Sequence, residues 1–166
     1  MKRSKADVET LIAELEFDRA QLGLLFETNS RAQSRILHGA KEDLDYAALG
    51  YTLHNLYGVI ENACFRIAKF FENGLSPTSW HRDLLDRMLL TISAIRPAFF
   101  ERDEHALLDE LRALRHVFRN FYSRPLDTDR LLLLQNKVPL IQTAVFSAFD
   151  RYHTFLNTLK DSIEAS

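Results

Sequence analysis

The chain has 166 residues, 46% of them hydrophobic, and a formal net charge of -2. A chain of this length can bury about 70% of the surface that it exposes when unfolded, so we expect one domain over residues 1–166 that folds without a disulfide or a metal ion. The net charge excludes a surface that attracts polyanions everywhere, so binding to nucleic acid requires a local basic patch. The sequence contains no run of about 18 apolar residues, so it predicts no membrane span.

The start of the chain predicts a long first helix. Ser4 is a candidate N-cap, and Asp7, three residues later, can complete a capping box. The polar residues 1–5 are not followed by a signal-type apolar segment, which favours a cytosolic protein. The helix is expected to run past Phe26 toward Ile36, and a polar turn with Gly39 follows over residues 38–45. Its apolar face consists of Leu11, Ile12, Leu15, Leu22 and Leu25.

The second helix has the strongest periodicity in the chain. Its apolar residues recur at steps of three and four, which predicts burial along the whole helix. Gly74, between Asn73 and Leu75, is placed to end it with a left-handed turn. The single cysteine, Cys64, lies within this helix, which suits a packing role in a reducing compartment. The periodic residues are Leu49, Leu53, Leu56, Tyr57, Ile60, Cys64, Ile67 and Phe71.

Prolines and polar caps divide the rest of the chain. Residues 76–79 form a turn in which Ser79 can cap a helix that begins at Trp80, carries Leu84, Leu85, Met88 and Leu89, and is ended by Pro97. After a connection over residues 96–102, Asp103 is expected to cap a helix that Pro125 ends. The last region opens at Asp127.

The last region contains Pro139, which either kinks a continuous helix or starts a new one. No strand-like alternation appears, and no segment repeats. The sequence therefore predicts an all-α, up-and-down bundle of four main helices plus a short fifth. The apolar stripe of the last region is Ile141, Val145, Phe149, Tyr152, Phe155, Leu156 and Leu159.

Residues 114–122 place a cationic cluster at the margin of a helical stripe made of Leu107, Leu111, Leu114 and Phe118. Arg115 lies at the edge of that stripe, and Tyr122 returns to within about 20° of it on a helical wheel. Arg115 and Arg119 can hold a phosphate with fork-shaped donors, and Tyr122 adds a hydroxyl or a stacking ring. The structural alternative is that Arg115 pairs with Asp109, Glu110 or a carboxylate on another helix.

Other chemistry finds little support in the sequence. A carboxylate-bridged metal site in a bundle uses two Glu-x-x-His pairs, and only Asp150-x-x-His153 comes near that pattern. One such pair is typical of a solvated helix face, so we expect no metal and no cofactor. A glycine-rich phosphate loop would follow a strand, and no strand is predicted.

The motif residues resemble a known signature. Arg115, Asn120 and Tyr122 follow the spacing of the Arg-x4-His-x-Tyr motif of HEPN-domain toxins of the HepT-like type, with Asn120 at the histidine position. Residues 53–61 resemble the long second helix of those proteins, and residues 79–85 resemble the turn and helix that follow. Leu126 and Asp127 also fit, so the resemblance extends from about residue 45 to 159.

The resemblance implies an HEPN fold and a metal-independent endoribonuclease, the toxin of a pair whose partner is a small nucleotidyltransferase. It also implies a homodimer in which two motif helices face each other. A homodimer suits the residues as well, because a second copy would close a walled phosphate cleft around the cationic cluster. In the implied reaction a ribose 2′-hydroxyl attacks the adjacent phosphate, which Arg115 holds and neutralises. Arg119 and His116 are expected to contribute to phosphate binding.

Asn120 departs from the family pattern because an amide cannot exchange a proton near pH 7. The proton-transfer contribution, typically about 10²–10⁴-fold, is then missing unless another group supplies it. His116, four residues earlier on the same helical side, and His81, through a tertiary contact, are the candidates. Each has the alternative of an ordinary surface or packing histidine.

Tyr122 is the expected acceptor of AMP, since in HepT-like toxins the partner nucleotidyltransferase modifies the corresponding tyrosine. Such an adduct would occupy the donors of Arg115 and Arg119 that a substrate phosphate needs. A second hypothesis is a non-catalytic helical subunit that binds a nucleotidyltransferase, which Asn120 favours. A third is an interaction bundle without a site, in which carboxylates saturate Arg115 and Arg119.

Overall fold

The computed structural model describes residues 3–72, 80–119 and 126–164, and these form an all-α bundle. Four helices are long and two are short; within the described residues there is no strand, and the isolated β-bridge joins Ile92 and Arg96. The predicted fold class is confirmed, with two short helices where the sequence indicated one. The helices are α1 (Lys5–Leu37), α2 (Asp43–Phe71), α3 (Trp80–Arg87), α4 (Arg102–Arg119), α5 (Thr128–Gln135) and α6 (Val138–Glu164).

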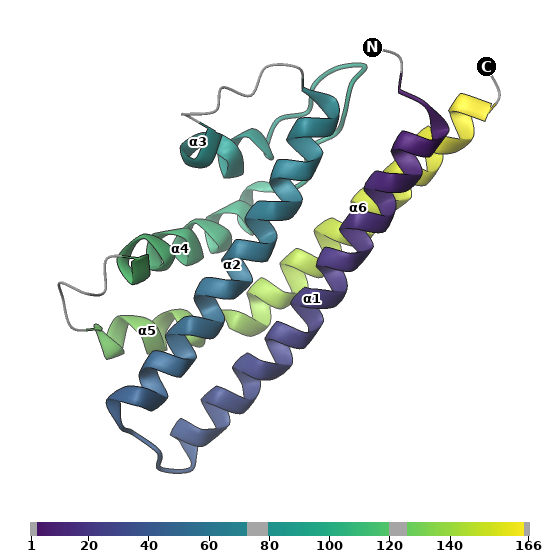
Figure 1. Cartoon of the computed structure of the whole chain (residues 1–166). Coiled ribbons are helices and arrows are strands. Elements are labelled where there is room, and N and C mark those ends of the chain that lie inside the picture. Colours follow the sequence, from purple (N-terminus) through teal and green to yellow (C-terminus); the bar gives the residue numbers. More distant parts are fainter. Residues whose placement is uncertain (1–2, 73–79, 120–125, 165–166) are drawn as a thin grey trace.

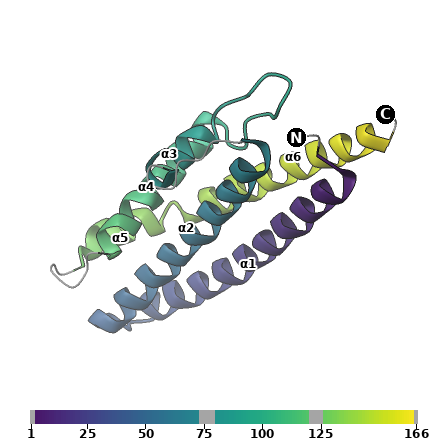
Figure 2. The ribbon, with the colours of Figure 1, turned by 45° about the horizontal axis from the view of Figure 1, so that its top comes forward.

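The helix α2 lies in the middle of the bundle (Figures 1 and 2). It packs along α1 on one side and against α4 on the other, and α6 contacts both α1 and α4. The short helices α3 and α5 lie near the two ends of α4 (Figure 1). The start of α1 and the end of α6 lie at the same end of the molecule in both views. The second half of α4 is thereby held against α2.

The first helix begins and ends as its sequence predicts. The Asp7 N–H donates to Oγ of Ser4 at 3.2 Å, and the Ser4 N–H donates to the Asp7 carboxylate at 2.8 Å, which completes the predicted capping box. The hydrogen bonds that the Ser4 N–H and hydroxyl donate to the Asp7 carboxylate lower the pKa of Asp7. The helix continues to Leu37, past Phe26 and Ile36. Gly39 then takes a φ of 102°, a left-handed conformation that glycine adopts without strain.

The second helix supplies the centre of the core. Its predicted apolar residues are buried except Phe71, which is partly buried, and Cys64 is a free, buried thiol, which confirms its packing role. Burial raises the pKa of Cys64, so the thiol stays protonated. The helix begins at Asp43, so the preceding turn is shorter than residues 38–45. The predicted stop at Asn73, Gly74 and Leu75 lies outside the described residues, as does the predicted cap Ser79.

The third helix is shorter than predicted. It ends at Arg87, ten residues before Pro97, so Met88 and Leu89 lie in a turn. The reason is a contact with a later part of the chain. The Met88 carbonyl accepts hydrogen bonds from the N–H groups of Phe99 and Phe100, at 2.8 and 3.2 Å, instead of from the next turn of a helix. Both phenylalanines are buried, so the predicted connection after Arg96 is part of the core.

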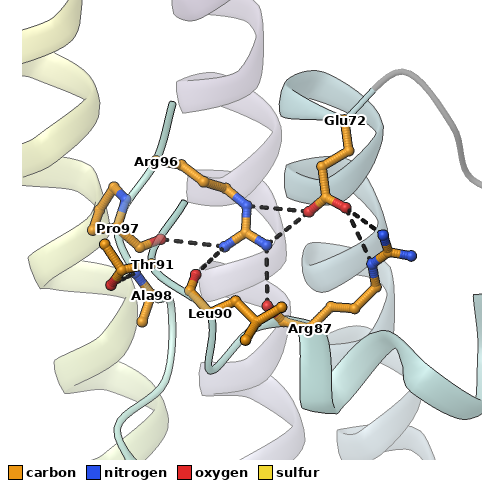
Figure 3. Close-up of polar contacts among 7 residues, drawn as sticks. All are labelled: Glu72, Arg87, Leu90, Thr91, Arg96, Pro97 and Ala98. Carbon is orange, nitrogen blue, oxygen red and sulfur yellow. Dashed lines mark hydrogen bonds and ion pairs between the residues drawn. The ribbon is translucent and has the colours of Figure 1, made fainter. Parts of the chain in front are cut away.

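The buried side chain of Arg96 organises this turn (Figure 3). Its guanidinium donates to the Glu72 carboxylate, at 2.7 Å from Nη2 and 3.2 Å from Nε. It also donates to the carbonyls of Leu90, Pro97 and Arg87. Arg87 binds the other oxygen of Glu72 at 3.0 Å. Every N–H of a fully buried cation therefore has an acceptor, which is the condition for burying it.

The remaining helix boundaries follow their caps with one correction. The fourth helix begins at Arg102, so Asp103 lies in its first turn and is not its N-cap; the N–H of Glu101 instead donates to the Glu104 carboxylate at 2.8 Å. The last region opens at Asp127 as predicted, and this residue caps α5 by accepting the Arg130 N–H. Pro139 starts a new helix, since it lies in the first turn of α6. The predicted stop at Pro125 lies outside the described residues.

A buried amide pair fixes α5 against α1 and α2. The Asn29 and Gln135 side chains exchange two hydrogen bonds of 2.8 Å, and the Asn29 amide also donates to the Thr52 hydroxyl. All three side chains are buried and satisfied. This network makes the placement of α5 specific, because a shifted helix would leave amide groups unpaired.

Candidate functional site

The candidate site is the seam between α2 and the second half of α4. On α2, the residues Gly50, His54, Tyr57 and Glu61 meet this half of α4. They recur at steps of four, three and four and so share one face of the helix. The ring of Phe118 packs against Gly50 so closely that a Cβ there would lie 2.9 Å from Cε2 of Phe118. A glycine at position 50 therefore leaves room for the Phe118 ring against α2.

Arg115 projects into this seam. Its Nη1 forms a short hydrogen bond and ion pair with Glu61, and its guanidinium lies 5.5 Å from the centre of the Tyr57 ring. The Arg115 side chain is 21% exposed and that of Glu61 is 14% exposed, so the pair is shielded but reaches solvent. Nε of Arg115 is buried and has no hydrogen-bond partner within the described residues. The predicted position at the edge of the apolar stripe is confirmed.

Of the two interpretations of Arg115, the structure shows the pairing with a carboxylate of another helix, Glu61. That contact leaves other N–H donors of the guanidinium available. Arginine carries five N–H donors in a planar fork, and Glu61 takes one nitrogen. The rest of the exposed edge can contact a second anion while Glu61 and Tyr57 hold the plane of the group.

Tyr57 forms the inner wall beside Arg115. Its side chain is buried, and burial raises the pKa of its phenol, an effect that the neighbouring Arg112 and Arg115 only partly oppose. The phenol therefore stays neutral, and its ring offers the guanidinium a cation–π contact.

His54 forms the wall one helical turn along α2 from Tyr57. Its imidazole stacks on the Phe118 ring, with centroids 5.4 Å apart and planes at 29°. Phe118 lies in the chain between Arg115 and Asn120. The seam thus brings a histidine ring beside the motif helix, from a part of the chain about sixty residues earlier.

A comparison with family models matches residues 48–156 to the family described as HepT-like protein. The match covers well over half of the chain, including both sides of the α2–α4 seam. The chain belongs to the HepT-like family. This membership supports the HEPN toxin family in general. A comparison with curated proteins gives no significant match, and neither does one with solved structures.

The other site residues predicted for this HepT-like chain are only partly described. His116 is exposed on α4. Arg119 is the last residue of α4, and His81 lies in α3, but their side chains are outside the described part, as are Asn120 and Tyr122 entirely. Of the predicted cluster, the structure therefore places Arg115 and His116.

No metal centre is found in the part of the HepT-like chain that the structure describes, where no three His, Cys, Asp or Glu side chains form a group that could hold an ion. Asp150 and His153 are engaged instead in surface ion pairs of 3.0 Å with Arg19 and Glu16 of α1. A search of the same residues identifies no helix long and apolar enough to cross a membrane.

Sequence reasoning missed the contributions of His54 and Glu61 to the seam. Both lie in a segment that resembles the family's second helix, but nothing in the local pattern says which face of that helix meets α4. Their spacing of seven residues, on the same face as Tyr57, is the signal that could have found them.

Proposed function

We propose that this HepT-like protein is a metal-independent endoribonuclease, the toxin of a toxin–antitoxin pair whose partner is a small nucleotidyltransferase. The proposal covers the whole of residues 1–166 as one domain acting on RNA in the cytoplasm without a cofactor. The observation that carries it is the placement of Arg115. A partly exposed guanidinium, oriented by Glu61 and Tyr57, lies on the helix that leads into Asn120 and Tyr122.

The proposed chemistry needs a group that neutralises a phosphate. When a ribose 2′-hydroxyl attacks the adjacent phosphate, negative charge grows on the phosphoryl oxygens, and a fixed guanidinium stabilises it. We assign this role to Arg115, with Arg119 and His116 as further phosphate contacts and His81 as an auxiliary group. Asn120 and Tyr122 complete the motif, and the amide at position 120 attenuates proton transfer.

The first prediction is that Arg115→Ala weakens binding of single-stranded RNA by about 10-fold or more, because one phosphate contact is lost. The slope of log K against log salt should fall by about 0.7, the value for one phosphate on a single strand. Equilibrium titration of a fluorescent oligonucleotide at several salt concentrations measures both. Arg115→Lys keeps a charge beside Glu61 but loses the fork, so its affinity should lie in between.

The matched control is Arg31→Ala, which removes the same charge from an exposed position on α1. It should leave RNA affinity within about 2-fold, because this exposed arginine lies on α1, outside the α2–α4 seam, and exposed charges are screened by salt. Melting temperatures of all variants establish that the fold is kept. Equal losses in the Arg31 and Arg115 variants, or RNA binding that is absent or indifferent to Arg115, would refute the proposal.

A second candidate function is a non-catalytic subunit that binds the nucleotidyltransferase. Two observations favour it: Asn120 stands where the family has histidine, and Glu61 already pairs with Arg115. In either function, Tyr122 is our candidate for AMP modification. The adduct would place a phosphodiester within reach of Arg115 and Arg119 and block RNA by competition.

Modification of Tyr122 is tested by incubation with the nucleotidyltransferase encoded beside this gene and ATP, followed by peptide mass spectrometry. We expect one AMP adduct on the peptide that contains Tyr122 and none in Tyr122→Phe. Adducts only on other residues would contradict the assignment. A gene neighbourhood without a nucleotidyltransferase would count against both paired functions.

We also propose a homodimer in which two motif helices face each other across the RNA. A single seam exposes one edge of Arg115, and a second copy would supply the opposite wall of a phosphate cleft. Light scattering should report twice the monomer mass at micromolar concentration. A monomer at all accessible concentrations would contradict this arrangement.

A further inference from the structure

The chain has six histidines, and the structure engages three of them away from the α2–α4 seam. A ring nitrogen of His38 bonds to the Ser34 carbonyl at 2.7 Å, at the end of α1. His105 pairs with Asp86 of α3 at 2.7 Å, and His153 pairs with Glu16. His116 is exposed on α4. Of the histidines whose side chains are described, His54 is the one stacked in the seam.

His54 and Arg115 are neighbours along the seam. On α2, His54 precedes Tyr57 by three residues, about 4.5 Å along the helix axis at 1.5 Å per residue. On α4, Phe118 follows Arg115 by the same interval. Since the Arg115 guanidinium lies over Tyr57 and the His54 ring lies over Phe118, the two groups occupy successive turns of the same seam.

The surroundings of His54 suit a fixed proton acceptor. The side chain is half-buried, and its ring orientation is set by stacking on Phe118, whose own position is set by contact with Gly50. A half-buried ring loses little freedom when it meets substrate, which is what positions a general base. Imidazole is also the side chain whose ordinary pKa lies nearest to neutral pH.

We propose that His54 is a catalytic residue of this protein and supplies the proton transfer that Asn120 cannot. The inference rests on the proposed ribonuclease function. In the step, Nε2 of His54 takes the proton of the ribose 2′-hydroxyl as the 2′-oxygen bonds to phosphorus, because Nδ1 is buried and does not meet substrate. The bond from phosphorus to the 5′-oxygen breaks, and a water molecule protonates that oxygen. The imidazolium returns its proton to the hydroxide that remains, and the products are a 2′,3′-cyclic phosphate and a 5′-hydroxyl end. Arg115 neutralises the phosphoryl oxygens throughout.

The test is His54→Phe in the full-length protein. Phenylalanine keeps an aromatic ring on Phe118 and removes both nitrogens, so the melting temperature and RNA affinity should be retained. The cleavage rate at saturating RNA should fall by about 10²-fold or more, the usual range for a lost proton transfer. In His54→Ala, added imidazole should restore part of the rate, a response that a purely structural histidine would not give.

The second part of the experiment repeats the His54 substitution in the Asn120→His variant. If both groups transfer protons, the loss caused by His54→Phe should shrink to less than about 10-fold in an Asn120→His background, a non-additive result. His54→Phe that cleaves at the wild-type rate overturns the role of His54 and leaves the ribonuclease function standing. The role of His54 is also overturned if the wild-type protein binds RNA without cleaving it while the Asn120→His variant does cleave it. Absence of Arg115-dependent RNA binding overturns both.

Discussion

Replacing Asn120 by histidine should raise the rate of RNA cleavage by about 10- to 10⁴-fold, the upper end being the full range for a proton transfer. An amide donates and accepts hydrogen bonds but keeps its protons, whereas imidazole exchanges one near neutral pH. The gain should be near the upper end if the wild type has no substitute base. It should be near the lower end if His54 already supplies one, because two bases do not add.

The measurement is the single-turnover rate on a single-stranded RNA in the presence of a chelator. Asn120→Gln is the matched control, since it changes side-chain size without providing an exchangeable proton near pH 7. The double variant with Arg115→Ala should lose the gain, because phosphate neutralisation is still needed. A histidine variant that is folded and no faster than the wild type would move the catalytic centre away from this motif.

Replacing Arg96 by methionine should lower the free energy of unfolding by about 3–5 kcal/mol, the cost of breaking a buried ion pair by removing one partner. The guanidinium is fully buried and binds Glu72 and three backbone carbonyls (Figure 3). Methionine fills much of the same space but satisfies none of these acceptors. The carbonyls of Leu90 and Pro97 would lose the donor that Arg96 provides, while the Arg87 carbonyl keeps the N–H of Leu90.

Urea unfolding followed by circular dichroism measures this loss. Arg87→Met is the matched control: Arg87 binds the same carboxylate, but its side chain is 40% exposed. Its loss should cost about 1 kcal/mol or less, as for other solvent-exposed ion pairs. Equal destabilisation by the two substitutions would show that burial of Arg96 does not decide the stability of this turn.

Features fixed by neighbouring residues could be predicted from the sequence. The capping box at Ser4 and Asp7 needs residues three apart, and the burial of Cys64 follows from the three- and four-residue steps of α2. The end of α3 could not be predicted, because it depends on a tertiary contact. The Arg96 side chain donates hydrogen bonds to the carbonyls of Arg87 and Leu90, at and just after the last residue of that helix. A local pattern contains no information on such a contact.

The candidate site could likewise be predicted only in part. The sequence of its own helix was enough to place Arg115 at the edge of the apolar stripe. Its partner Glu61 lies 54 positions earlier, and which carboxylate it meets depends on how α2 crosses α4. The stacking of His54 on Phe118 depends on the same crossing, which the absence of a side chain at Gly50 permits. These tertiary contacts require the folded structure.

Photo-cross-linking of a single-stranded RNA that contains 4-thiouridine, followed by peptide mass spectrometry, tests the central claim most directly. If RNA lies at the α2–α4 seam, adducts should concentrate on two peptides, one containing His54 to Glu61 and the other Arg115 to Phe118. They should decline in Arg115→Ala and persist in Arg31→Ala. Adducts confined to the outer faces of α1 or α6, and unchanged by Arg115→Ala, would contradict the account.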